Sequence, residues 1–191
     1  NFKLGILAFF FILWYSTGGP TRPISFAGPY ISPITDVDSA QEGYGGDGAS
    51  VAIDPRNRDV IYASSQYLGL ARSINGGNNF TAARSGIVGP TTFIMPYVLD
   101  RAAPDRLFAG TQRVWRSDDQ GRSWRAISRV FGLDYADLVS AVAVSAVNPE
   151  HALSANRKSI FANRQALQAG ATTAWMPRSP RSGWVSSLVF D

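Results

Sequence analysis

One short pattern occurs twice in the sequence and constrains the fold more than any other feature. It runs from Ser73 to Phe80 and again from Ser117 to Trp124, and both copies read Ser-x-Asn/Asp-x-Gly-x-x-aromatic. An Asn or Asp side chain accepts hydrogen bonds from backbone N–H groups two residues on, and Gly tolerates positive φ. We therefore predict a tight turn between two strands in each copy, with the aromatic ring buried against the sheet. The residues given this structural role are Ser73, Asn75, Gly77, Phe80, Ser117, Asp119, Gly121 and Trp124.

The sequence around these turns repeats with a longer period. Asp54, Asp100, Ser145 and Asp191 end similar apolar stretches, at intervals of 46, 45 and 46 residues (54 to 100, 100 to 145 and 145 to 191). A unit of about 40–50 residues with four strands is typical of a β-propeller blade. We therefore predict an all-β chain, a partial β-propeller of about three clear blades and the start of another. The predicted blade limits are 50–92, 93–139, 140–184 and 185–191.

Four short strands are expected in each unit. In the first unit they cover residues 50–54, 60–65, 68–73 and 79–83, and in the second 93–100, 106–110, 113–117 and 123–128. The first strand of a unit is almost continuously apolar, as expected when both of its faces are buried. The third unit has a degenerate turn, in which Asn163 stands at the serine position and Trp175 is the candidate aromatic.

The segment before the repeats allows several interpretations. A largely apolar run from Leu4 to Tyr15 follows Lys3. The run is short for a membrane span, which needs about 20 apolar residues, and it resembles the apolar part of a secretory signal. A buried strand is the alternative, and a membrane anchor is the third interpretation. We predict a signal-like or buried segment at 1–18, an irregular segment at 19–49 and an extracytoplasmic or secreted location.

Composition excludes several classes of chemistry. With no cysteine the chain has neither disulfides nor thiolate chemistry, and with one histidine, His151, a transition-metal site is not expected. The sequence has no phosphate-binding Gly-x-x-x-x-Gly-Lys-Ser/Thr loop, so we predict no nucleotide and no cofactor. The formal net charge of +4 comes from scattered arginines, which we interpret mainly as solvated strand faces. An anionic partner is the alternative, although nucleic acid is not expected, and the oligomeric state is not indicated.

The Ser-x-Asp-x-Gly-x-x-Trp turn resembles the Asp-box, also called the bacterial neuraminidase repeat. Propellers with this repeat include sialidases, xyloglucanase-type glycoside hydrolases, sortilin-like receptor domains and a photosystem II assembly factor. The resemblance covers about residues 43–191, and it includes Gly45-Gly46-Asp47-Gly48 before the first strand. It implies that the turns lie at the blade periphery, away from the active face, and have a structural role. Because function lies in sites carried by a fold, the resemblance is informative about the fold and much less about activity.

Loops that lead into the first strand of each blade are expected to meet at one mouth of the channel. They are residues 36–48, 84–92, 129–139 and 178–183. Carboxylates on neighbouring loops can supply the acid and base of a glycoside hydrolase, and the catalytic candidates are Asp47, Asp134 and Asp137. The binding candidates are Glu42, Tyr44 and Tyr135. Ordinary exposed loop carboxylates are the alternative. Tyr44, Tyr67, Tyr97 and Trp115 are candidate sugar-stacking rings, with blade core as the alternative for Tyr97 and Trp115.

Two functions follow as hypotheses. The first is a secreted, non-catalytic propeller module that binds carbohydrate or protein through its loops and is part of a longer protein. The second is a sialidase- or xyloglucanase-like glycoside hydrolase with an acidic pair at the channel mouth. An assembly factor for a membrane complex is a third possibility, for which only the basic charge speaks.

Overall fold

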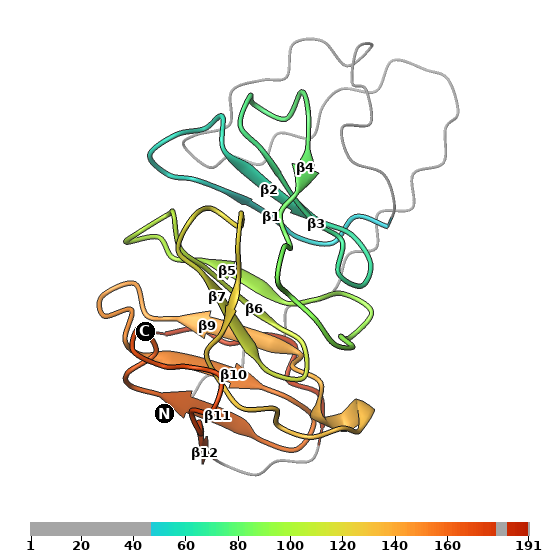
Figure 1. Cartoon of the computed structure of the whole chain (residues 1–191), viewed down its shortest axis with the longest axis vertical. Coiled ribbons are helices and arrows are strands. Elements are labelled where there is room, and N and C mark those ends of the chain that lie inside the picture. Colours follow the sequence, from blue (N-terminus) through green and yellow to red (C-terminus); the bar gives the residue numbers. More distant parts are fainter. Residues whose placement is uncertain (1–46, 179–182, 191) are drawn as a thin grey trace. The chain divides into compact units, whose positions relative to one another are not determined.

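The structure is a computed structural model that describes residues 47–178 and 183–190 (Figure 1). It contains three four-stranded sheets, each an antiparallel meander in sequence order. The first sheet, blade 1, consists of β1 (Val51–Ile53), β2 (Ile61–Ser64), β3 (Leu70–Ser73) and β4 (Thr81–Ala82). Blade 2 consists of β5 (Tyr97–Leu99), β6 (Leu107–Gly110), β7 (Val114–Ser117) and β8 (Arg125–Ala126). Blade 3 consists of β9 (Ala141–Val144), β10 (Ala152–Ala155), β11 (Ile160–Asn163) and β12 (Met176–Arg178).

These sheets confirm the predicted fold class. Every strand of blades 1 and 2 lies within the range expected for it, and the described residues otherwise contain one 3₁₀ turn, η1 (Tyr135–Asp137). The described part of the chain holds no helix long and apolar enough to cross a membrane. The predictions for residues 1–18 and 19–46 concern residues outside the described ranges.

Neighbouring blades pack face to face and share two apolar cores. One core joins Tyr62 and Leu70 of blade 1 to Leu107 and Trp115 of blade 2. The other joins the opposite face of blade 2, with Phe108, to blade 3. Strands β6 and β7 are consequently buried along their whole length, as expected for a sheet covered on both sides.

The first strand of blade 1, β1, does not have the two buried faces that were expected. Val51 and Ile53 are largely exposed, whereas the equivalent strand β9 is buried over Ala141–Ala143. The physical reason is position, because no other described sheet packs on that side of blade 1. The same apolar sequence therefore has a different environment in different blades.

The two Ser-x-Asn/Asp-x-Gly turns have nearly identical hydrogen bonds. Ser117 Oγ donates to Asp119 Oδ1 at 2.8 Å and accepts the Gly121 N–H at 2.8 Å, while Asp119 Oδ1 also accepts the Ser123 N–H at 2.9 Å. In blade 1 the same three bonds join Ser73, Asn75, Gly77 and Asn79 at 2.9, 2.9 and 3.0 Å. Gly121 has φ of 78°, which makes glycine the favoured residue there.

Both turns confirm the prediction in outline and correct it in detail. The Asn or Asp oxygen accepts an N–H four residues on, and it is the serine hydroxyl that binds the nearer N–H groups. Trp124 is buried as predicted, whereas Phe80 is only partly buried. Trp124 and Trp175 bury their rings against the preceding blade. Phe80 lies in blade 1, which has no preceding blade among the described residues.

This contact with the preceding blade is a repeated hydrogen bond. Trp124 Nε1 donates to the Ala83 carbonyl and Trp175 Nε1 to the Ile127 carbonyl, both at 2.9 Å. Trp175 is therefore the buried aromatic of the degenerate third turn, in which Asn163 Oδ1 accepts the Gln165 N–H.

A second repeated bond runs in the opposite direction. Arg72 Nη1 donates to the Gln120 carbonyl in the blade 2 turn at 2.9 Å, and Arg116 Nη1 donates to the Ala166 carbonyl in blade 3 at 2.8 Å. Each interface between described blades thus includes one indole and one guanidinium that donate to backbone oxygens of the neighbour. These bonds fix how the sheets stack, and with them where the connecting loops lie.

Candidate functional site

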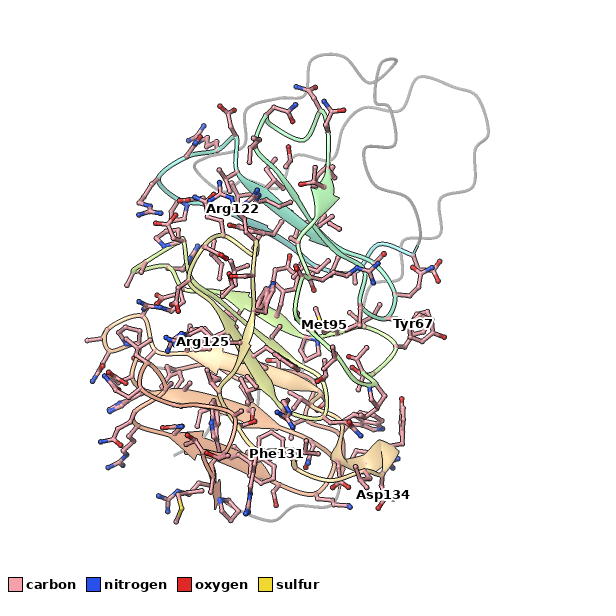
Figure 2. The ribbon with its side chains drawn as sticks, in the orientation of Figure 1. Tyr67, Met95, Arg122, Arg125, Phe131 and Asp134 are labelled. Carbon is pink, nitrogen blue, oxygen red and sulfur yellow. The ribbon has the colours of Figure 1, made fainter. Side chains whose placement is uncertain are left out.

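The loops at one end of the three blades lie side by side, as their hydrogen bonds show. The Tyr67 N–H donates to the Phe93 carbonyl, the Val139 N–H to that of Thr111, and the Arg157 N–H to that of Ala136. We call this surface the loop face, made of residues 65–69, 84–96, 111–113, 129–140, 156–159 and 183–186. In Figure 2 Tyr67 and Asp134, on the loop face, lie along one edge, and Arg122 and Arg125 lie along the other. The predicted loops 84–92 and 129–139 belong to the loop face.

Asp134 and Asp137 come together with Lys158 on the loop face. The Lys158 ammonium lies 2.8 Å from Asp137 Oδ1 and 3.4 Å from Asp134 Oδ2. Its pKa is raised by the hydrogen bond to Asp137 and, to a smaller extent, by Asp134. The two candidate carboxylates therefore share one cation.

The two carboxylates have different environments. The Asp137 side chain is 8% exposed, and its Oδ2 accepts the Asp134 N–H at 3.2 Å, which closes turn η1. Gly132 makes room for it, because a Cβ at residue 132 would collide with the carboxylate. The Asp134 side chain is 80% exposed. Asp137 is thus engaged in holding the loop, whereas Asp134 faces solvent.

Two exposed aromatic rings stand next to this acid–lysine cluster. Tyr135 and Trp184, 57% and 49% exposed, meet edge to face with ring centroids 5.7 Å apart. The Arg157 guanidinium lies 5.0 Å from the centre of the Trp184 ring, a cation–π contact. Ser140 Oγ donates to the Val185 carbonyl at 2.7 Å and anchors the segment that carries Trp184. We call Tyr135, Arg157 and Trp184 the Tyr135 cluster.

Asp47 is bonded to the loop that carries one of a second pair of rings. Its N–H donates to Gln66 Oε1 at 2.9 Å, and Gln66 precedes Tyr67, whose ring meets Phe93 edge to face at 5.5 Å. A cavity of about 530 Å³ is lined by residues that include Gln66 and Tyr67. Different residues thus hold the two carboxylates' loops: Gln66 bonds to Asp47, and Lys158 pairs with Asp134.

The remaining candidates divide between core and undescribed residues. The Tyr97 hydroxyl lies 3.0 Å from the Ser50 carbonyl oxygen in blade 1, and burial raises the pKa of Tyr97. Trp115 is buried and donates to Thr111 Oγ1. Both rings are therefore structural, whereas Glu42 and Tyr44 lie outside the described residues. Within residues 47–178 and 183–190, no group of three or more acidic or histidine side chains is placed to bind a metal ion.

Sequence reasoning missed Trp184, Arg157, Lys158 and Phe93. The predicted fourth loop ended at Gly183, one residue before Trp184. Arg157 and Lys158 lie in the loop between the second and third strands of blade 3, a class of loop absent from the predicted mouth. In an antiparallel meander this loop lies at the same end as the loops that enter each blade, so strand counting alone was enough to include it.

Comparison with known proteins supports the fold. The sequence matches no protein-family model and no curated protein. Among solved structures, an ancestral GH74 enzyme is similar with a TM-score of 0.57 and 17% identity, over 79% of this chain and 21% of that one. The GH74 xyloglucanase from Xanthomonas campestris is similar with a TM-score of 0.51 and 18% identity, over 67% of this chain and 23% of that one.

The chain therefore spans about a fifth of the length of the enzymes it resembles in structure. At this level of identity the likeness concerns the fold alone. Together with three four-stranded meanders stacked face to face, it shows that the chain is a partial β-propeller.

Proposed function

We propose that the chain is part of an Asp-box propeller module that acts outside the cytoplasm and binds carbohydrate through its loop face. The Asp-box assignment rests on the Ser73–Phe80 and Ser117–Trp124 turns, whose hydrogen bonds coincide bond for bond. The carbohydrate assignment rests on the Tyr135 cluster.

The observation that carries this proposal is the exposure of two large rings among polar groups. Apolar surface rimmed by polar residues marks interaction sites, and binding sites combine aromatic faces with a few placed polar groups. Tyr135 and Trp184 supply the faces, while Arg157 and Asp134 supply a hydrogen-bond donor and an acceptor. A sugar ring has the matching chemistry, because it has apolar C–H faces and a hydroxyl rim.

Binding is supported better than hydrolysis by the state of the acids. A glycoside hydrolase needs one carboxyl group as acid and a second as base or nucleophile. Asp137 is largely buried, bonded to Lys158 and to the Asp134 N–H, which leaves Asp134 as the exposed acid of this cluster. The hydrolase reading, with Asp47, Asp134 and Asp137, is favoured by the GH74 enzymes among the structural neighbours and remains the second candidate.

Affinity electrophoresis of the 191-residue chain tests the binding proposal. Gels containing xyloglucan, soluble cellulose derivatives or bacterial cell-wall glycans should retard the chain in at least one case. Trp184→Ala and Tyr135→Ala should clearly reduce the retardation, and Val147→Ala, at an exposed apolar site between β9 and β10, is the matched control. Unretarded migration in every glycan, with a folded protein, would contradict the proposal.

Release of reducing sugar separates the second candidate from the first. A binding module should release none from any glycan that it binds. Turnover that is lost in Asp47→Asn or Asp134→Asn and kept in Val147→Ala would instead establish the hydrolase.

A further inference from the structure

Tyr67 has an unusual backbone conformation for an aromatic residue. Its φ is 58°, in the left-handed region that bulky side chains rarely adopt. The conformation is imposed by a tight loop, in which the Ser65 N–H donates to the Gly69 carbonyl at 2.7 Å and the Gly69 N–H to the Gln66 carbonyl at 3.1 Å. Such outliers persist where the surroundings impose them, and they concentrate at functional sites.

The strained loop does not bury its ring. Tyr67 is 59% exposed, and Phe93, which it meets at an angle of 75°, is 49% exposed. The backbones are joined by the Tyr67 N–H bond to the Phe93 carbonyl at 2.6 Å and by a parallel bridge between Tyr67 and Ile94. Figure 2 shows Tyr67 projecting from the edge of the ribbon. A glycine at 67 would avoid the strain, so the exposed ring is the feature that the loop retains.

Polar groups surround these rings as they surround the Tyr135 cluster. Gln66 accepts the Asp47 N–H through Oε1 at 2.9 Å, which holds Asp47 beside the loop that carries Tyr67. The cavity of about 530 Å³ lies against Gln66 and Tyr67. Tyr67 and Phe93 thus provide aromatic surface, and Gln66 places an amide between Asp47 and a cavity that continues over Phe80 and Ala82.

The two aromatic sites belong to one continuous surface. Thr111 connects them, because its Oγ1 donates to the Val88 carbonyl in the loop that carries Phe93, and its carbonyl accepts the Val139 N–H from the loop that carries Tyr135. The Tyr67 site lies at blades 1 and 2 and the Tyr135 cluster at blade 3 and the segment after it. Since packed sheets lie about 10 Å apart, the separation is roughly 20 Å.

We propose that Tyr67 and Phe93, with Gln66 and Asp47, form a second glycan-binding site, so that the chain holds one extended polysaccharide strand at two points. This inference rests on the proposed function, which it deepens from carbohydrate in general to long polymers. A short oligosaccharide fills one site, whereas a polymer fills both. Linking two binding events raises overall affinity by factors of 10²–10⁴ when the geometry permits both.

The test compares soluble xyloglucan polymer with the short oligosaccharides obtained from it, by calorimetry on the 191-residue chain. We expect polymer to bind at least about 10-fold more tightly per chain than the oligosaccharides. Tyr67→Gly should remove most of that advantage while oligosaccharide binding at the Tyr135 cluster persists. Trp184→Ala should also remove the advantage, and Tyr67→Phe, which keeps the ring, should retain it.

Folding is a separate readout in this experiment. Because glycine accepts positive φ, Tyr67→Gly should keep or raise the melting temperature. Polymer binding that Tyr67→Gly leaves unchanged, or polymer affinity equal to that of oligosaccharides, overturns the two-site inference and leaves the proposed function standing. If the wild-type chain binds neither xyloglucan polymer nor its oligosaccharides and also migrates unretarded in every glycan gel, both proposals fail.

Discussion

Asp119 and Asn75 occupy the same position in two turns and differ by one charge. Partial burial raises the pKa of Asp119, but hydrogen bonds from Ser123 and Ser117 outweigh it, so the pKa lies below its ordinary value. Asn75 accepts from Ser73 and Asn79 in the same geometry without the charge. The pair makes it possible to measure what the carboxylate adds to one turn.

This difference predicts a pH dependence. A carboxyl group with a depressed pKa in the folded state contributes stability above its unfolded pKa of about 3.9 and loses it as pH falls through the folded value. Because solvent screens an exposed charge, Asp119→Asn should lower the free energy of unfolding by less than about 1 kcal/mol at pH 7, and by less still at pH 3. Asn75→Asp should do the reverse. Urea denaturation at the two pH values is the measurement, and equal losses for Asp119→Asn at both would contradict the role of the charge.

Tyr62 presents the opposite case at the residue scale, a polar atom without a partner. Its ring is fully buried between blades 1 and 2, its hydroxyl has no hydrogen bond among the described residues, and burial raises its pKa to about 12. Phe108 occupies the equivalent position in blade 2, paired with Arg116 as Tyr62 is with Arg72.

Replacing this hydroxyl should be favourable or neutral. Leaving a buried polar group unsatisfied costs about 1–3 kcal/mol, so Tyr62→Phe should keep or raise the free energy of unfolding by up to about that amount. Chemical denaturation provides the measurement, with Phe108→Tyr as the mirror variant, which should destabilise. A loss of stability in Tyr62→Phe would mean that the hydroxyl has a partner in solution, such as a buried water.

At the scale of elements, the aromatic that follows each turn determines how the turn is used. Trp124 and Trp175 reach a carbonyl of the preceding blade through the indole N–H, although their turns differ in sequence and length. Phe80 has no such donor. The polar turn therefore shapes the hairpin, and the indole joins one hairpin to the next.

Variants of Trp175 should separate packing from hydrogen bonding. Trp175→Phe should cost about 1 kcal/mol for the lost bond to Ile127, and Trp175→Ala about 3–5 kcal/mol because it also leaves a cavity. The measurement is the midpoint of thermal or chemical unfolding. If the two variants were equally stable, the ring would not be part of the core.

At the scale of the whole molecule, the arginine bonds between blades are unequal. Arg116 is buried, and its Nε pairs with Asp118 at 3.0 Å while Nη1 binds the Ala166 carbonyl. Arg72 makes the equivalent carbonyl bond, but its Nε has no partner among the described residues, since Ile74 stands where Asp118 does. The arginine that joins blade 2 to blade 3 is therefore better satisfied than the arginine that joins blade 1 to blade 2.

Methionine substitutions should reveal this inequality. Arg116→Met should destabilise the chain by about 2 kcal/mol or more, because it leaves a buried carbonyl unsatisfied, and it should speed amide hydrogen exchange at Ala166. Arg72→Met, its matched control, should cost less. The reverse order would show that the two interfaces are not built on the same bond.

Local and periodic features were predictable from the sequence. The turns at Ser73 and Ser117 were found because they depend on residues a few positions apart, and the blades were found because Asp54, Asp100 and Ser145 recur at one period. Trp175 was identified by aligning the third unit with the first two, and it is the buried aromatic that the alignment predicts. These properties need no knowledge of what lies far along the chain.

The loop face depended on the tertiary structure. Whether Asp137 holds a turn or faces solvent is decided by Lys158 and Gly132, and whether Trp184 is core or surface is decided by Tyr135 and Arg157. Such contacts join loops of different blades, and they arise only when the sheets stack in register. Sequence thus determined the repeating unit through short-range hydrogen bonding and apolar periodicity, whereas the environment of each loop side chain was decided by packing between units.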